Sequence, residues 1–435
     1  MKASISAVEV TRRAVYPADA VLVIDCQRSL SETDLPFALE KFLGRSALQR
    51  NIRQLAQQGT KHCVIAVKNA QELGVVGKIA EEQLSEIDAR KMSCHLVAFD
   101  TLKYMDEAAW GLDVVFVNGN SVFDDRLFDA VFRSTAPSTT VAGPEGKAVG
   151  LVKLPNDDLC RILQSDHQDL TMRNGDLRGL RAIDTDSVPH YVASMRRIFP
   201  PYWHELENSE DLKAAADKVM DAAQKGVLDF PARYLHPLPE NFLTRLAAGT
   251  SITPNQITVF SAVLAFIGTY LFATESYFAA LSLALIAGIL DGVDGKLARV
   301  KLLSSPFGDR LDHTLDVTFE FSWYIAIAWG LSQTHSDPSL FGLGFFMIGI
   351  MLTARALSGS YLYLTGHQIH DHTAFDRMVR LFAGRRNIYV LVLLVGYLMG
   401  NLLSSFYVVV AWGLATASIY LMRNAVAIMQ KYARA

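Results

Sequence analysis

Six long apolar segments dominate the second half of this 435-residue chain. Each is close to the length of about 20 mostly apolar residues that a helix needs to cross a bilayer. The first half has the charged composition of an ordinary soluble domain. We therefore expect a soluble domain followed by an all-α domain of six transmembrane helices, at 255–274, 277–296, 312–334, 338–361, 385–402 and 404–428.

Basic residues occur in only some of the connections between these segments. They lie in the second-to-third loop (Arg299, Lys301, Arg310), the fourth-to-fifth loop (Arg377, Arg380, Arg385, Arg386) and the tail (Arg423, Lys431, Arg434). The other turns carry no Lys or Arg. Because basic loops stay on the cytoplasmic side, we expect an integral protein of the cytoplasmic (inner) membrane, with its soluble half and both termini in the cytosol.

Composition shifts along the chain suggest three regions. We expect a cytosolic domain at 1–200, a linker with membrane-surface helices at 201–252, and the membrane domain at 253–435. The segment 226–256 is mixed apolar and basic and is interrupted at Pro237 and Pro239. That pattern favours one or two short helices lying on the membrane surface, with a plain linker as the alternative.

Apolar runs in the first half recur at 20–25, 62–67, 94–99, 113–119 and 139–143. Helix-like stretches lie between them at 35–57, 71–89 and 125–133. Alternation of strands and helices is typical of an α/β domain with a mostly parallel sheet.

Net charge and cysteines exclude some classes of function. The formal net charge of -3 gives no sign of a nucleic-acid-binding surface. Cys26, Cys63, Cys94 and Cys160 all lie in the soluble half and form no C-x-x-C pair. We expect free thiols in a reducing compartment rather than a metal site.

Four aspartates lie where the second and third apolar segments approach the same loop. Asp291 and Asp294 are three residues apart, and Asp312 and Asp316 are four apart, so each pair shares one helix face. The short loop makes the two helices antiparallel neighbours, so all four carboxylates can converge. Such a cluster is unstable alone, because like charges and partial burial raise the carboxyl pKa values. A divalent cation with a preference for oxygen ligands, Mg²⁺, Mn²⁺ or Ca²⁺, relieves that repulsion.

Carboxylate-held cations suit chemistry at phosphorus. Two such ions support in-line attack and neutralise a diphosphate. Gly295 and Gly308 allow close approach of a ligand to the backbone, and Ala298 leaves room on the face of Asp294. Arg299 and Lys301 lie where phosphates or anionic lipid head groups would bind. The alternatives are solvated helix ends, or an ion pathway, which the clustering of the acids at one interface disfavours.

The spacing Asp291-x2-Asp294-Gly295-x2-Ala298-Arg299-x8-Gly308-x3-Asp312-x3-Asp316 resembles the complete CDP-alcohol phosphotransferase signature. Residues 251–258 are also similar to the segment that opens the first span in that family, and the likeness extends over about 226–430. The resemblance implies six transmembrane helices, a cytosol-facing polar cavity and a homodimer. It also implies a role in phospholipid biosynthesis.

The resemblance further implies residue roles and a reaction. Asp291, Asp294 and Asp312 would be ligands of Mg²⁺ or Mn²⁺, and Asp316 a ligand or the general base. Gly295, Ala298, Arg299 and Gly308 would hold the cytidine nucleotide. An alcohol acceptor would attack the phosphorus of a CDP-linked donor and CMP would leave, with at least one of the two substrates a lipid.

The choice of substrate is less constrained. The donor could be CDP-diacylglycerol, with a polar alcohol as acceptor, or a CDP-linked head group, with a lipid or polyol acceptor. His313 follows the third aspartate, as in the choline/ethanolamine branch, and its catalytic or structural role stays open. Inositol-phosphate-using members carry Arg after the fourth aspartate, where this chain has Val317, which argues against a phosphorylated acceptor.

Two further polar features lie on the cytosolic side of the expected membrane domain. Arg355 is a candidate for binding a donor or acceptor phosphate, or it extends to the interface as an ordinary membrane arginine. The loop 367–377 has three His and two Asp, which either bind a metal or form a solvated loop.

The first half looks like the nucleotidyltransferase part of fused inositol-phosphate cytidylyltransferase and di-myo-inositol-phosphate-phosphate synthase proteins. Residues 113–131 are similar to a nucleotidyltransferase stretch with a metal-binding Asp, and Asn118, Gly119 and Asn120 occupy that neighbourhood here. The first strand leads into 25–34, which has no glycine to cradle a triphosphate. We expect a nucleotidyltransferase-like domain without activity. The alternatives are a bifunctional enzyme that makes its own donor and a non-catalytic membrane scaffold.

Overall fold

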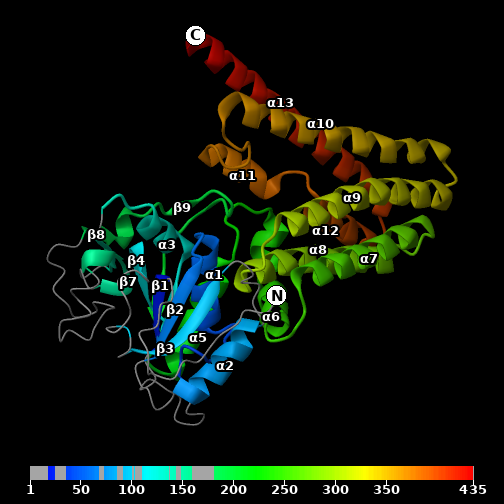
Figure 1. Ribbon diagram of the computed structural model, residues 1–435. Helices are drawn as coiled ribbons and strands as arrows, with labels where there is room; N and C mark the ends of the chain where they lie inside the picture. The colour runs from blue at the N-terminus through cyan, green and yellow to red at the C-terminus, as the bar shows by residue number, and fades with distance from the viewer. Residues whose placement is uncertain are drawn as a thin grey trace. The chain divides into compact units, whose positions relative to one another are not determined.

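The computed structural model describes residues 18–24, 36–67, 73–85, 92–99, 102, 110–136, 138–143, 148–158 and 181–434. They divide into two compact units (Figure 1). One unit comprises the described residues up to 192 together with 198–222, and the other comprises 193–197 and the residues from 223 onward. The segment 25–34, Cys26 and Cys160 lie outside the described residues.

The first unit is built on a seven-stranded sheet with the strand order β3-β2-β1-β4-β7-β6-β8. Its strands are β1 (Ala18–Ile24), β2 (His62–Val67), β3 (Ser93–Ala98), β4 (Trp110–Asn118), β6 (Thr139–Ala142), β7 (Ala148–Pro155) and β8 (Arg181–Asp184). Strands β3, β2, β1 and β4 run parallel, and β7 is antiparallel to both of its neighbours. The prediction of a mostly parallel α/β sheet is confirmed. Sequence reasoning missed β7 and β8.

Helices accompany this sheet: α1 (Ala47–Gln57), α2 (Leu73–Ser85), α3 (Asp125–Phe132) and α5 (Ser209–Ala222). The stretch expected to be helical from residue 35 forms its helix only from Ala47, because Ser46 and Gln49 build a capping box there. Cys63 and Cys94 are free and buried, opposite each other on β2 and β3. The sequence reading of them as free thiols is therefore consistent with their place in the core.

Four short strands form two further pairs. β5 (Ser121–Phe123) pairs with β11 (Trp203–Glu205), while β9 (Tyr191–Val192) pairs with β10 (Arg197–Ile198). A single 3₁₀ turn, η4 (Thr185–Ser187), precedes β9. Strand β11 and helix α5 belong to the first unit, and the chain continues in the second unit from residue 223. The division at 200 and 252 stays a prediction.

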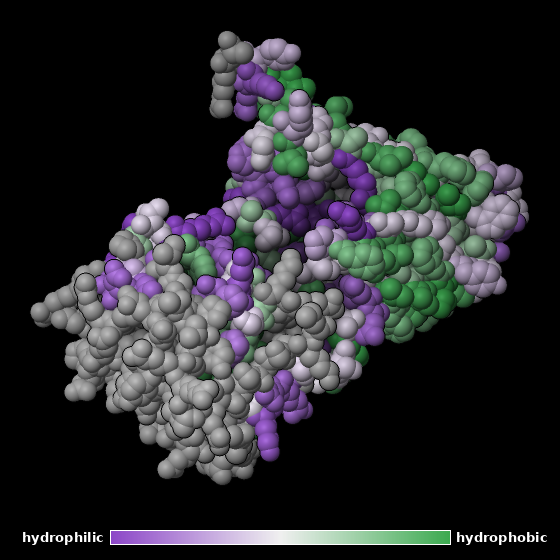
Figure 2. Space-filling model, in the orientation of Figure 1, coloured by the Kyte–Doolittle hydropathy of each residue, from purple (hydrophilic) through white to green (hydrophobic). Residues whose placement is uncertain are grey.

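The second unit is helical. It contains η5 (Pro231–Leu235), α6 (Pro237–Ala248), α7 (Pro254–Ala273), α8 (Tyr277–Val300), α9 (Pro306–Thr334), η6 (Pro338–Leu340), α10 (Phe341–Thr365), α11 (Ala374–Phe382), α12 (Arg386–Leu398) and α13 (Leu402–Arg434). Figure 2 shows apolar side chains gathered along its helices.

Five helical stretches among the described residues are long and apolar enough to cross a membrane: Pro254–Ala273, Tyr277–Val300, Pro338–Thr365, Ala374–Leu398 and Leu402–Tyr432. Helix α9 has 29 residues but is not among them, since its first half carries the charges of the acidic motif. An integral membrane unit follows from these five stretches. The count of six spans stays a prediction.

Packing fixes the relation between α7, α8 and α9. Buried side chains on the three helices form one apolar cluster that includes Phe272, Leu281 and Trp323. A Cβ at Gly330 would collide with the backbone oxygen of Phe272, so glycine lets α9 lie directly against the end of α7. This packing aligns the polar ends of α8 and α9 beside the start of α7.

Gly150 offers a test of the sheet. Its φ is +85°, and an added Cβ would lie 2.6 Å from the Cβ of Asn118, whereas Gly59 has φ +89° and nothing within 4 Å. We expect Gly150→Ala to lower the free energy of unfolding by about 3 kcal/mol, combining backbone strain with overpacking, and Gly59→Ala by about 1 kcal/mol from strain alone. Thermal unfolding of the full-length variants measures both, and equal losses would contradict this packing.

Candidate active site

The structure brings the acidic motif together. Asp291 on α8 and Asp312 and Asp316 on α9 each offer a carboxylate oxygen, and these oxygens lie within 4.8 Å of one another. All three side chains are half-buried. Carboxylates at this separation can share one hard divalent cation, so the donor set fits the metal that the sequence predicts.

Asp294, the fourth aspartate, is buried and held from a different helix. Its Oδ2 accepts a hydrogen bond of 2.5 Å from Thr258 Oγ1, on α7. The start of α7 therefore orients this carboxylate. Thr258 is a site residue that the motif spacing alone did not reveal, although it lies in the segment 251–258.

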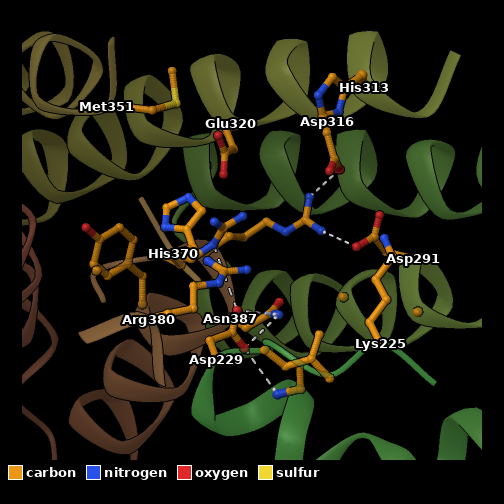
Figure 3. A pocket seen from close by; sticks show the side chains of 18 of the residues that line it. Lys225, Asp229, Asp291, His313, Asp316, Glu320, Met351, His370, Arg380 and Asn387 are labelled. Atoms are coloured by element: carbon orange, nitrogen blue, oxygen red, sulfur yellow. Dashed lines mark hydrogen bonds and ion pairs between the residues drawn. The ribbon is translucent and has the colours of Figure 1, made fainter. Parts of the chain in front are cut away.

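An arginine lies among the acids. Arg386, the first residue of α12, places Nη1 2.5 Å from Asp316 Oδ1 and Nη2 3.2 Å from Asp291 Oδ2. Dashed lines in Figure 3 mark these contacts at Asp291 and Asp316. Sequence reasoning used Arg386 only to orient the membrane helices. The need of four carboxylates for positive charge is the signal that could have pointed to such a partner.

These groups line a cavity of about 610 Å³ within the second unit. Four of the residues that the sequence proposed for ligands other than metal also line it: Gly295, Arg299, His313 and Arg355. Arg299 is held by a hydrogen bond of 2.8 Å from its Nε to the backbone oxygen of Ala223. His313 is exposed, one residue after Asp312, and lies near Asp316 (Figure 3).

Three other expected residues are not part of the cavity lining: Ala298, Lys301 and Gly308. Lys301 is buried, and its ammonium donates to the backbone oxygens of Thr250, at 2.6 Å, and Ile252, at 2.9 Å. Lys301 therefore ties the end of α8 to the chain before α7. Its contact with a phosphate stays a prediction.

Gly308 also has a packing role. A Cβ at this position would come within 2.8 Å of Asn255 Oδ1, so glycine allows the start of α9 to lie against the start of α7. The contact of Gly308 and Ala298 with the nucleotide stays a prediction.

Arg355 on α10 lines the cavity and forms an ion pair of 2.7 Å with Glu320 on α9. Glu320 is a further acidic residue of the cavity, one turn beyond Asp316, that sequence reasoning did not single out. The ion pair fixes the Arg355 side chain against α9 at the wall of the cavity.

The opposite side of the cavity is basic. Arg196, Arg380, Arg385 and His370 line it, and Figure 3 shows Arg380 and His370 across the cavity from Asp291 and Asp316. Arg380 is only 5% exposed, and its Nε and Nη1 have no hydrogen-bond partner. Burial, reinforced by the arginines, lowers the pKa of His370 to about 2, so its ring is neutral. A buried, unpaired guanidinium facing a cavity favours an anionic ligand.

The His-rich loop is held by ring contacts. His367 and His372 stack with ring centroids 4.3 Å apart, and Tyr361 Oη lies 2.7 Å from His372 Nδ1. In the described part of the chain, the acidic cluster is the one group with metal-ligand geometry. The structure therefore gives no support to a metal site in this loop.

A buried ion pair attaches α6 beside the site. Lys296 Nζ lies 2.7 Å from Glu240 Oε2 and donates to Asn241 Oδ1 at 2.8 Å. The Glu240 carboxylate lies so close to Gly292 that a Cβ there would collide with it. This contact links the short helix α6 to α8 between Asp291 and Asp294.

Comparison with known proteins agrees with this geometry. Residues 251–419 match the family model for CDP-alcohol phosphatidyltransferase. Residues 251–419 therefore form a CDP-alcohol phosphatidyltransferase domain. The protein is therefore an integral membrane enzyme of the transferase class, which agrees with the family resemblance of its motif.

Three relatives illustrate the range of the likeness. A bifunctional IPC transferase and DIPP synthase of Aquifex aeolicus is 24% identical over 413 residues, 86% of this chain and 90% of that protein. A protein of the same name from Rubrobacter xylanophilus is 31% identical over 26% of each chain. An archaetidylinositol phosphate synthase of Pyrococcus horikoshii is 29% identical over 28% of this chain and 65% of that protein. The match to the Aquifex aeolicus protein includes both units of this chain.

The Lys296–Glu240 pair can be tested by its energetics. We expect Lys296→Met to lower stability by about 3 kcal/mol, because it leaves a buried carboxylate without a counter-charge. The double variant Glu240→Gln/Lys296→Met should recover more than half of that loss. Thermal unfolding of purified protein in detergent measures both variants, and a double variant at least as unstable as the single one would refute the pairing.

Proposed function

We propose that this protein transfers a substituted phosphate group from a CDP-linked donor to an alcohol at the membrane surface and releases CMP. The observation that carries the proposal is the group of three carboxylates within 4.8 Å, in the part of the chain that matches the family model. Its position on the wall of a polar cavity suits a water-soluble nucleotide and a lipid that meet at the bilayer surface.

Mg²⁺ or Mn²⁺ is the cofactor that this set of oxygen ligands favours. Asp291, Asp312 and Asp316 would hold it, with Asp294 as a further ligand oriented by Thr258. A bound divalent cation supplies charge neutralisation for the diphosphate of the donor.

Residues of the chain carry out proton transfer and bind the two substrates. Asp316 takes the proton of the acceptor hydroxyl, the acceptor oxygen bonds to the phosphorus nearer the alcohol of the donor, and the bond from that phosphorus to the CMP oxygen breaks. Gly295 and Arg299 line the cavity next to the acids, where they can hold the cytidine nucleotide. His313, exposed beside Asp312, is placed to contact the acceptor.

We infer that the acceptor is a phosphorylated alcohol. Arg380, buried and without partners at Nε and Nη1, faces the same cavity as the acids. Inositol-phosphate-using members of the family carry Arg where this chain has Val317. Arg380, on α11, supplies a positive charge in its place. The archaetidylinositol phosphate synthase of Pyrococcus horikoshii, a relative over 28% of this chain, carries an inositol phosphate product in its name. Both observations favour a phosphorylated acceptor, although Val317 argued against one in the sequence.

The first unit, we infer, resembles a nucleotidyltransferase but does not make the donor, since residues 25–34 provide no glycine-rich phosphate loop. The bifunctional alternative has support of its own, because the Aquifex aeolicus relative is named as bifunctional and matches 86% of this chain. Release of pyrophosphate from CTP by the full-length protein would establish the bifunctional alternative.

Helix α6 fits a position on the membrane surface, as the sequence predicts. Leu238, Phe242 and Leu246 follow one another at four-residue intervals and are 85%, 68% and 62% exposed. An apolar stripe on a short helix that follows the soluble unit is typical of an interfacial helix. We propose that both termini face the cytosol, that α9 completes six spans, and that the protein works as a homodimer.

Loss of one metal ligand should abolish the reaction. We expect Asp312→Asn to lower kcat for metal-dependent CMP release by at least about 100-fold, because the carboxylate is lost from the cluster. Asp309→Asn, an exposed position in the same helix outside the cluster, is the matched control and should retain activity.

The assay offers CDP-diacylglycerol, CDP-ethanolamine, CDP-choline, CDP-glycerol and CDP-inositol in turn. Equal rates for the two variants would contradict the site. Metal binding without CMP release from any donor would favour a scaffold.

Arg380 provides a test of acceptor class. We expect Arg380→Met to raise KM for inositol phosphate or glycerol phosphate by about 10- to 100-fold, the cost of a charge-assisted hydrogen bond. KM for the donor should not change. Arg377→Met, an exposed change in the same helix, is the control. The proposal of a phosphorylated acceptor is wrong if wild-type protein uses unphosphorylated inositol or glycerol equally well. It is also wrong if Arg380→Met raises KM for these unphosphorylated alcohols by the same factor.

A further inference from the structure

Arg386 makes the closest cationic contact with the acidic cluster among the described residues. One nitrogen of its guanidinium bonds Asp316 Oδ1 on α9, and another pairs with Asp291 Oδ2 on α8. The side chain is 12% exposed, and its guanidinium carbon lies 5.6 Å from the centre of the Phe319 ring. The guanidinium therefore bridges the two helices that carry the motif.

The place of Arg386 in the chain is unfavourable by itself. It is the first residue of α12, where the helix dipole disfavours positive charge. Burial of a guanidinium adds a desolvation cost. The two carboxylates offset both costs, so the arginine and the acids depend on each other.

The same carboxylates are the proposed metal ligands. Asp291 and Asp316 each give an oxygen to the arginine, and both belong to the group whose oxygens lie within 4.8 Å. Lys225 and Arg299 also lie near these acids, but three cations cannot neutralise four carboxylates. The site therefore keeps a negative charge that attracts a divalent cation, although Arg386 opposes that cation at close range.

We propose that Arg386 is a built-in counter-cation that holds Asp291 and Asp316 together in the metal-free protein and competes with the divalent ion for them. The inference rests on the proposed metal-dependent function. It assigns Arg386 a positioning role that lowers the apparent metal affinity while it keeps the metal-free cluster folded. A purely structural anchor would act differently, because its loss would disorder the ligands and weaken metal binding.

The test compares full-length wild type, Arg386→Met and Arg386→Lys in detergent micelles with added lipid. Isothermal titration with Mn²⁺ gives the affinity, and thermal unfolding in EDTA gives the metal-free stability. Arg377→Met removes one positive charge from an exposed site on the same segment and serves as the matched control. We expect Arg386→Met to bind Mn²⁺ about tenfold more tightly and to unfold at a lower temperature in EDTA.

Arg386→Lys keeps the charge but cannot bridge two carboxylates, so it should lose metal-free stability while its Mn²⁺ affinity stays near that of wild type. It also keeps the inference testable if Arg386→Met does not fold. Unchanged or weaker Mn²⁺ binding by Arg386→Met, or a Lys variant as stable as wild type in EDTA, would overturn the inference. A wild-type protein that binds no Mn²⁺ would instead overturn the proposed function.

Discussion

Repulsion among carboxylates at the end of an apolar helix pair is the constraint on which the rest of this site depends. Asp291, Asp312 and Asp316 lie too close together to be stable without positive charge. The chain supplies part of that charge through Arg386 and orients Asp294 through Thr258. In the proposed function, the remaining negative charge is what would make the cluster a cation site rather than a set of solvated helix ends.

The surrounding helices separate two kinds of charge within one cavity. Acids from α8 and α9 occupy one side, and the guanidinium of Arg380 lies on the other (Figure 3). In the proposed function, a donor diphosphate would be drawn to metal at the acidic side, while an anionic acceptor would be drawn to the basic side. The attacking oxygen and the phosphorus would therefore meet between them, so positioning accounts for most of the catalysis.

Local spacing predicted the part of the site that lies on two neighbouring helices, because residues three or four apart share a face wherever the helix is packed. It could not place Arg386, which is 70 residues from Asp316 in the chain, or the unpaired Arg380. Nor could it distinguish a cavity-facing glycine, Gly295, from a packing glycine, Gly308, since that depends on which helix lies opposite. In the sheet, apolar runs that alternate with helix-like stretches identified the parallel strands. They did not identify β7, although its side chains are largely buried.

An anomalous diffraction map from crystals of the full-length protein grown with Mn²⁺ and CDP would test the acidic site directly. We expect a manganese peak among the carboxylates of Asp291, Asp312 and Asp316, with the diphosphate against it and the peak absent from Asp312→Asn. Manganese found elsewhere, such as in the loop 367–377, or a diphosphate bound away from the acidic cluster, would show that these aspartates are not the metal site.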